Sequence, residues 1–280
     1  STEACQNVFQ PKALVCTSNF DRDCLSLNKV AALIRMHKGP HNSKNQALYT
    51  SWDYDAGIRS KNWRMWKVES TISAWSNKPI GVVMGAASLA HIFTTPFTNV
   101  AGDVYSLEEY LLAFDFDKDA PKIYGTNNQF KESAMSIMTP PDAVKPTLTE
   151  FKRLGGKMMI FHGNSDPVFS VKDTMRWYDF LNFALEGRAP EFVRLYRVPG
   201  MPHGQGGPSA DQFDMLQPLV SWVERKKSPQ DVMAATRTEN PEITARMAGM
   251  TRPLCPYPSY AQYKKGDLLK ASSFQCVVTK

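Results

Sequence analysis

Two short apolar runs stand out in the pattern of hydrophobic and polar positions along the second half of the chain. Residues 158–161 (Met-Met-Ile-Phe) and 192–198 (Phe-Val-Arg-Leu-Tyr-Arg-Val) show no helical periodicity, and each ends in Gly, Pro or Asn turn signals. Buried strands of a parallel sheet have this pattern. Between the runs, from Ser170 onward, apolar residues recur at helical spacing. The pattern predicts a strand–helix–strand unit whose two strands end at the same edge of the sheet.

The first half of the chain has the pattern of short helices on an irregular frame. Ser26 predicts the start of a helix that the Gly-Pro pair at 39–40 ends. Residues 106–109 (Ser-Leu-Glu-Glu) form a capping box, which predicts a helix through Phe114. Residues 48–68 are rich in aromatic side chains, and we expect them to be loop-like. Such a run either lines a cleft for aromatic ligands or supplies buried area where regular structure is scarce.

A change in composition at Thr139-Pro-Pro predicts a boundary between two regions, residues 1–141 and residues 142–280. In the second region, Thr147 or Thr149 is expected to start a short helix before the first strand. A further helix is predicted over 211–226, with a bend at Pro218.

Composition and charge limit the classes of protein. With 280 residues, of which 42% are hydrophobic, the chain is long enough to bury a sizeable core in one or two domains. The net charge of +6 comes from scattered Lys and Arg, which argues against nucleic-acid binding. No apolar run has the roughly 18 residues of a membrane span. The polar start, Ser-Thr-Glu-Ala-Cys-Gln, is no signal peptide, so any signal has been removed or lies on another segment.

Five cysteines favour disulfides over a metal site. They form no C-x-x-C pair and have no histidines at zinc spacing. Cys16 and Cys24 flank a short polar loop, and Cys255 and Cys276 bracket a Tyr- and Pro-rich tail, so either closure would fasten a segment with little core of its own. Cys5 then has no partner. The alternative is a cytosolic protein with five reduced thiols.

Two polar residues follow the predicted strands and carry the candidate chemistry. Asp166 comes after the first strand and His203 after the second, in the chain order of the last two members of an α/β-hydrolase triad. A triad needs a histidine base and a buried carboxylate that orients it. The simpler alternatives are a turn-forming aspartate before Pro167 and a hydrogen-bonded loop histidine. The placement of Asp166 and His203 at the ends of adjacent strands favours the catalytic interpretation.

A nucleophile and a metal site are harder to find. No Gly-x-Ser-x-Gly pentapeptide is present; residues 85–88 (Gly-Ala-Ala-Ser) lack the second glycine, and Ser165 lies in the loop of the acid. The alternating acids at 114–119 lack the glycine and the distal glutamate of a calcium-binding EF-hand loop, so a solvated turn is favoured. The absence of an H-E-x-x-H motif argues against a metal-dependent hydrolase.

Several motifs together resemble one enzyme family. The chain resembles the C-terminal part of the tannase and feruloyl esterase family over nearly its whole length. The segments that carry the resemblance are 24–26, 39–40, 63–66, 156–166, 196–203, 211–214, 219–224 and 251–258.

The resemblance implies an α/β fold, namely the C-terminal part of an α/β-hydrolase with an inserted mixed α/β lid domain. The lid region would be residues 1–141 and the hydrolase region residues 142–280. It also implies the roles of single residues: Asp166 as triad acid, His203 as base, Phe169, Trp66 and Ser88 as substrate contacts, and the disulfide pairs Cys16 with Cys24 and Cys255 with Cys276. No cofactor is implied in this chain, whereas the family allows a structural calcium in the preceding part of the lid.

The resemblance implies a carboxylic ester hydrolase for aromatic acid esters of the feruloyl, galloyl or terephthalate type. We expect a Ser-His-Asp mechanism with the serine on an N-terminal segment of the same esterase outside this chain, linked through Cys5, in a secreted or periplasmic protein. Two residues depart from the family pattern. Gly204 replaces a cysteine often found after the histidine, and Ile80 stands near an arginine of a terephthalate-hydrolysing member. The alternative function is a non-catalytic module that binds aromatic ligands.

Overall fold

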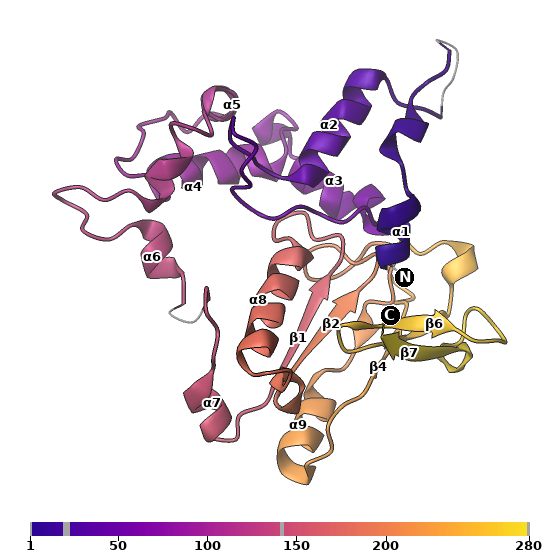
Figure 1. Cartoon of the computed structure of the whole chain (residues 1–280). Helices are drawn as coiled ribbons and strands as arrows, with labels where there is room; N and C mark the ends of the chain where they lie inside the picture. The colour runs from indigo at the N-terminus through magenta and orange to yellow at the C-terminus, as the bar shows by residue number, and fades with distance from the viewer. Residues whose placement is uncertain (1, 19–22, 141–142, 279–280) are drawn as a thin grey trace.

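The computed structural model describes residues 2–18, 23–140 and 143–278. The predicted boundary between residues 141 and 142 lies outside the described residues. Figure 1 shows most of the first region above the strands of the second. The α-helices of the first region are α1 (Thr2–Val8), α2 (Leu27–Lys38), α3 (Lys61–Lys67), α4 (Ala86–His91), α5 (Val104–Ala113) and α6 (Ala134–Met138).

The first region departs from the expected mixed α/β lid. In its described residues, 2–18 and 23–140, the regular elements are helical, and extended pairing is limited to the isolated bridges Val15 with Leu25 and His41 with Ala47. The run 48–68 is only partly a loop, because α3 holds Trp63 and Trp66.

The second region contains the strands and three further α-helices. These elements are α7 (Thr149–Arg153), β1 (Met158–Gly163), α8 (Val171–Ala184), β2 (Val193–Val198), β3 (Gln212–Phe213), α9 (Leu216–Arg225), β4 (Val232–Ala235), β5 (Thr251–Leu254), β6 (Ser259–Tyr263) and β7 (Phe274–Val278). β3, β4 and β5 form an antiparallel sheet, and β6 and β7 form an antiparallel pair.

The predicted strand–helix–strand unit is confirmed. β1 and β2 pair in parallel, from Met158 opposite Val193 to Gly163 opposite Val198. α8 connects them and lies alongside both strands in Figure 1. The carboxyl ends of β1 and β2 therefore meet at one edge of the sheet, which places the segments after Gly163 and Val198 next to each other.

Alternation along β2 divides the core between two faces. Val193 and Leu195 are fully buried in a cluster with residues of α8, whereas Tyr196 and Val198 are fully buried in a cluster with residues of β4 and β5. β1 is less covered, since Phe161 is 45% exposed. Within the described residues β1 pairs only with β2, so its outer edge is open.

Two helix starts were predicted wrongly. α5 begins three residues earlier than the capping box suggests, because the Asp103 carboxylate accepts from the backbone N–H groups of Tyr105 and Ser106 and displaces Ser106 as the cap. α9 begins at Leu216, since Gln212 and Phe213 pair with β4 instead. Pro218 lies in the first turn of α9, where a helix does not need its N–H, so no bend is required there.

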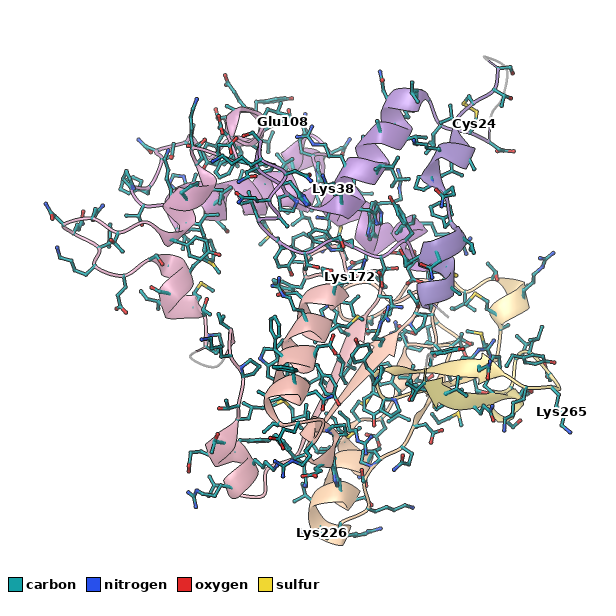
Figure 2. All side chains as sticks on the ribbon, viewed as in Figure 1. Cys24, Lys38, Glu108, Lys172, Lys226 and Lys265 are labelled. Carbon is teal, nitrogen blue, oxygen red and sulfur yellow. A yellow bond between two sulfur atoms is a disulfide. The ribbon has the colours of Figure 1, made fainter. Side chains whose placement is uncertain are left out.

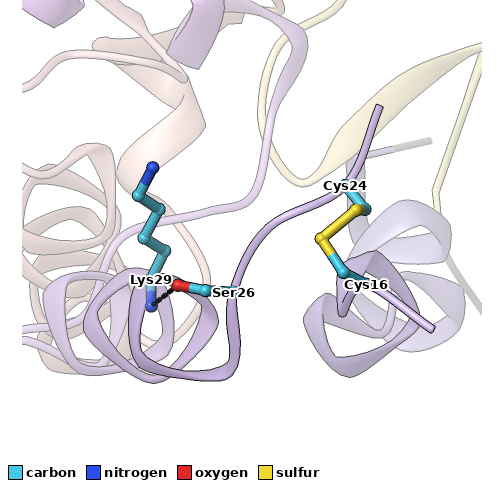
Figure 3. The surroundings of a disulfide bond; sticks show 4 residues. All are labelled: Cys16, Cys24, Ser26 and Lys29. Carbon is cyan, nitrogen blue, oxygen red and sulfur yellow. Dashed lines mark hydrogen bonds between the residues drawn. A yellow bond between two sulfur atoms is a disulfide. The ribbon is translucent and has the colours of Figure 1, made fainter. Parts of the chain in front are cut away.

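The structure contains both disulfides that the family resemblance implies. Cys16 is bonded to Cys24 just before α2, where the Ser26 hydroxyl accepts from the backbone N–H of Lys29 and caps the helix as predicted (Figure 3). Cys255 is bonded to Cys276 and ties the end of β5 to β7. The fifth cysteine, Cys5, is exposed and has a free thiol.

A buried histidine in the first region carries a pH-dependent contribution to stability. His37 is 3% exposed and stacks against Tyr54, with ring centroids 4.3 Å apart, and against Trp63 at 6.0 Å. Burial lowers the pKa of His37 from 6.5 to about 4. In the unfolded chain, His37 therefore binds a proton below about pH 6.5, whereas in the folded chain it stays neutral down to about pH 4.

We expect the free energy of unfolding to fall as the pH drops from about 6.5 to about 4, by on the order of 3 kcal/mol from His37 alone. The His37→Phe variant should lose much of this slope, and the His91→Phe variant, changed at an exposed histidine, should keep it. Urea unfolding at a series of pH values measures the slope. Equal slopes in the parent and the His37→Phe variant would contradict the assignment.

Candidate active site

The turn between β1 and α8 orients Asp166. One carboxylate oxygen, Oδ1, accepts from the backbone N–H groups of Val168 at 2.7 Å and Phe169 at 3.0 Å. The Asp166 side chain is only 5% exposed. The other oxygen, Oδ2, is thereby directed toward the loop that follows β2.

His203 lies on that loop and meets the carboxylate. Its Nδ1 donates to Asp166 Oδ2 at 2.8 Å, and its side chain is 45% exposed. Because a carboxylate oxygen can only accept, this contact assigns the proton to Nδ1 and leaves Nε2 with a lone pair. Nε2 forms no hydrogen bond within residues 2–18, 23–140 and 143–278. A half-exposed imidazole with one oriented and one free nitrogen is suited to proton transfer.

A second histidine supports the acid and was not predicted. His162, on β1, donates from Nε2 to the Phe169 carbonyl oxygen at 3.0 Å, and its Nδ1 accepts from the Thr174 hydroxyl at 2.8 Å. The same Nε2 lies 3.5 Å from Asp166 Oδ2. Burial acts to raise the pKa of Asp166, but hydrogen bonds from His162, His203 and the backbone outweigh it and lower the pKa. Asp166 is therefore ionised at neutral pH.

The aromatic run of the first region, residues 48–68, is hydrogen-bonded to the Asp166 turn. The Trp52 indole N–H donates to the Asp166 carbonyl oxygen at 3.0 Å. The Ser170 hydroxyl donates to the Ser51 carbonyl oxygen at 2.6 Å, and the Ser170 N–H donates to the Tyr49 hydroxyl at 3.2 Å. The aromatic density of residues 48–68 was the only signal in the sequence for this contact.

The Gly-rich loop after His203 is held by two carboxylates. Asp211 accepts from the Gly206 N–H at 2.6 Å, and Glu242 accepts from the Gly207 N–H at 2.8 Å. The second oxygen of Glu242 accepts from the Lys61 N–H at 2.7 Å, at the start of α3. Gly207 has a φ of +67°, and a Cβ there would lie 2.2 Å from the Gly200 carbonyl oxygen, so only glycine fits.

Of the three expected substrate contacts, one has a ring contact with the histidine. Phe169 is 58% exposed, and its ring centroid is 5.8 Å from that of His203. Trp66 lies on α3 and Ser88 on α4, both half-buried. Neither forms a hydrogen bond or ring contact with Asp166 or His203 in the part of the chain that the structure describes. A Cβ on Gly81 would lie 2.9 Å from the Trp66 carbonyl oxygen, so the segment before α4 packs against the end of α3.

The serines considered as nucleophiles are not bonded to the histidine. Ser165 is 2% exposed, and its hydroxyl donates to the Asp55 carboxylate at 2.8 Å. Across the described ranges, no serine hydroxyl is hydrogen-bonded to His203. The described part of the chain therefore presents Asp166 and His203 without a serine bonded to the histidine.

An acid followed by a histidine, at the carboxyl ends of adjacent parallel strands, is the order and placement that α/β-hydrolases use for these two triad members. The family model described as "Tannase and feruloyl esterase" matches residues 1–277. The chain belongs to the tannase and feruloyl esterase family.

Individual relatives agree with this assignment. The chain is 38% identical to the mono(2-hydroxyethyl) terephthalate hydrolase of Piscinibacter sakaiensis, over 98% of this chain and 47% of that protein. It is 33% identical to a probable feruloyl esterase of Arthroderma benhamiae, over 56% of this chain and 28% of that protein. The chain thus spans about half the length, or less, of the curated relatives it matches.

Solved structures show the same fold. Feruloyl esterase B from Aspergillus oryzae superposes with a TM-score of 0.61 at 17% identity, covering 99% of this chain and 51% of that chain. Tannin acyl hydrolase from Aspergillus niger has a TM-score of 0.61 at 16% identity, with 99% and 49% covered. The chain folds as about half of each of these proteins.

The described residues show neither a metal-ligand cluster nor a membrane-spanning helix. Within residues 2–18, 23–140 and 143–278, no three His, Cys, Asp or Glu side chains gather in a way that would hold a metal ion. In the same residues no helix is long and apolar enough to cross a bilayer.

We expect the pKa of the Asp166 carboxyl to lie below its ordinary value of 3.8. The His162→Phe variant should raise the pKa of Asp166, because a hydrogen-bond donor is lost. The ¹³C NMR shift of the carboxyl, followed from about pH 6 to about pH 2, measures this pKa. Asp103, whose pKa is lowered by its own bonds to Ser106, serves as internal control and should not respond. An Asp166 pKa that is the same in the parent and in the His162→Phe variant would contradict the role of His162.

Proposed function

We propose that this chain is the acid–base half of a carboxylic ester hydrolase that acts on esters of aromatic acids. The reaction follows a Ser-His-Asp mechanism in which Asp166 and His203 come from this chain and the serine comes from a segment outside it. The observation that carries the proposal is the 2.8 Å bond between His203 Nδ1 and Asp166 Oδ2 at the ends of β1 and β2. The family to which the chain belongs supports it.

In the proposed reaction, each residue has a distinct role. Asp166, ionised and held by two backbone N–H groups, keeps the proton of His203 on Nδ1. Nε2 takes the proton of the serine hydroxyl as the oxygen attacks the ester carbonyl, and the Asp166 charge stabilises the imidazolium. The imidazolium gives that proton to the leaving alcohol. In the second half, Nε2 takes a proton from water as the water oxygen attacks the acyl carbon, the acyl–serine bond breaks to release the carboxylic acid, and the imidazolium returns the proton to the serine oxygen.

The aromatic part of the substrate is placed beside the histidine. Phe169 presents an exposed ring 5.8 Å from His203, suited to packing against an aromatic acyl group. Trp66 and Ser88 contact the substrate from the lid region. Feruloyl, galloyl and terephthalate-type esters share an aromatic acid, and a panel of their methyl and glycol esters identifies the preferred one.

The serine-bearing segment is an N-terminal part of the same esterase. The open edge of β1 and the exposed Phe161 offer it a strand partner and apolar area. Cys5, with its exposed free thiol, links the two parts. The disulfides of this chain favour a secreted or periplasmic protein, because such bonds persist in oxidising compartments.

The opposing hypothesis, a non-catalytic module for aromatic ligands, rests on the lack of a serine bonded to His203. Activity of the assembled protein separates the two. A module would bind aromatic acids with or without the serine-bearing segment and would hydrolyse no ester in either case.

In the assembled enzyme, we expect His203→Ala to lower kcat by about 10²–10⁴-fold or more, since a positioned acid–base group supplies at least that factor. Asp166→Asn should also lower it strongly, because the amide no longer fixes the proton on Nδ1. His91→Ala, changed at an exposed histidine, is the matched control and should retain the parent rate. Hydrolysis of aromatic methyl esters provides the readout, and a His203→Ala rate within about tenfold of the parent would refute the proposal.

A further inference from the structure

One half-buried carboxylate of the first region bonds to both loops that carry the acid and the histidine. Asp55 Oδ2 accepts from the Ser165 hydroxyl at 2.8 Å and from the Gly200 N–H at 2.6 Å. Ser165 directly precedes Asp166, and Gly200 lies three residues before His203. A single oxygen atom therefore connects the Asp166 turn to the His203 loop.

The backbone around Asp55 is fitted tightly between these loops. A Cβ on Gly57 would lie 2.4 Å from the Gly200 carbonyl oxygen and 2.5 Å from the Ser165 Cβ. The lid backbone thus contacts both loops at once, and a side chain at position 57 would push them apart. Beyond Gly163 and Val198 the loops are bonded directly, by the Asn164 N–H to the Val198 carbonyl oxygen and the Ser165 N–H to the Met201 carbonyl oxygen, both at 3.0 Å, and Asp55 adds a side-chain link to these backbone bonds.

A neighbouring aspartate anchors the same segment. Asp53, 4% exposed, pairs with Arg197 of β2 at 2.7 Å and with Lys172 of α8 at 3.1 Å. Figure 2 shows Lys172 where the first region meets α8. With one anchor on β2 and another on α8, the segment cannot shift relative to the sheet without breaking buried ion pairs.

Asp55 is half-buried, and its bonded oxygen is held by these two donors. Burial raises the pKa of Asp55, and its hydrogen bonds with Gly200 and Ser165 oppose that rise. A buried acceptor that loses its donors is costly, so the two loops and the carboxylate are held together as a unit.

We propose that Asp55 is a positioning residue that sets the spacing of Asp166 and His203 from the lid region. This inference rests on the proposed function, because it assigns Asp55 to the acid–base pair of that reaction. Asp55 touches neither the reacting atoms nor the substrate and acts through Ser165 and Gly200.

The experiment compares Asp55→Ala, Asp55→Asn and the control Asp117→Ala in the assembled enzyme. Asp117 is also a lid aspartate that accepts a backbone N–H, from Ser43 at 3.2 Å, but it lies on an exposed loop. Asp55→Ala should lower kcat by about 10–100-fold with KM within about threefold, because small displacements of catalytic groups have effects of this size. Since both bonds go to one oxygen, the amide oxygen of Asp55→Asn replaces it and should keep kcat within about fivefold.

A second readout is independent of turnover. The proton between His203 Nδ1 and Asp166 gives a low-field NMR signal, which should vanish or broaden in Asp55→Ala and persist in Asp55→Asn and Asp117→Ala. If the assembled parent hydrolyses no ester, the proposed function fails, and this signal alone decides the role of Asp55. If Asp55→Ala does not fold, Ser165→Ala, which removes one of the two bonds, should still lower kcat by about 3–10-fold.

Three outcomes would overturn the inference. The first is a kcat of Asp55→Ala, or of Ser165→Ala where Asp55→Ala does not fold, within about twofold of Asp117→Ala. The second is an Asp55→Asn variant as impaired as Asp55→Ala, which would show that charge and not the position of the acceptor matters. The third is an unchanged low-field signal in Asp55→Ala.

Discussion

The parallel pairing of β1 with β2 is the constraint on which the candidate site depends. It brings the carboxyl ends of two strands together, so that a turn and a loop separated by α8 in the sequence become neighbours. Alternating residues of β2 bury against α8 on one face and against β4 and β5 on the other, which keeps the strand in place. The bond between Asp166 and His203 is the chemical result of this packing.

The first region contributes hydrogen bonds and ion pairs to the loops that carry Asp166 and His203. Three carboxylates lie at the contact between the two regions, namely those of Asp53, Asp55 and Glu242. Asp53 is 4% exposed and pairs with Arg197, whereas Asp55 and Glu242 each accept from a backbone N–H group of the other region. Removing one partner of a buried ion pair leaves an uncompensated charge and is strongly destabilising, so the two regions depend on each other.

The sequence predicted the parts of the fold that depend on local pattern. Apolar runs identified β1 and β2, and turn residues after them pointed to Asp166 and His203. Competing local signals caused the errors at the starts of α5 and α9, where Asp103 is the better cap and a strand pairing overrides helical periodicity.

The supporting residues could not be found in the same way. His162 gives no local signal for its role, because it acts from within a strand across the turn that follows. Asp55 and Glu242 have partners more than 100 residues away in the sequence. Only the folded chain brings such pairs together, and no periodicity or capping rule encodes them.

The most direct test of the account is the location of the nucleophile. The assembled, active enzyme is treated with an aryl phosphonate that modifies catalytic serines, and the labelled peptide is identified by mass spectrometry. We predict one labelled serine, on a segment outside these 280 residues, with labelling slowed by His203→Ala. A label on a serine of this chain, such as Ser88 or Ser165, would contradict the central claim.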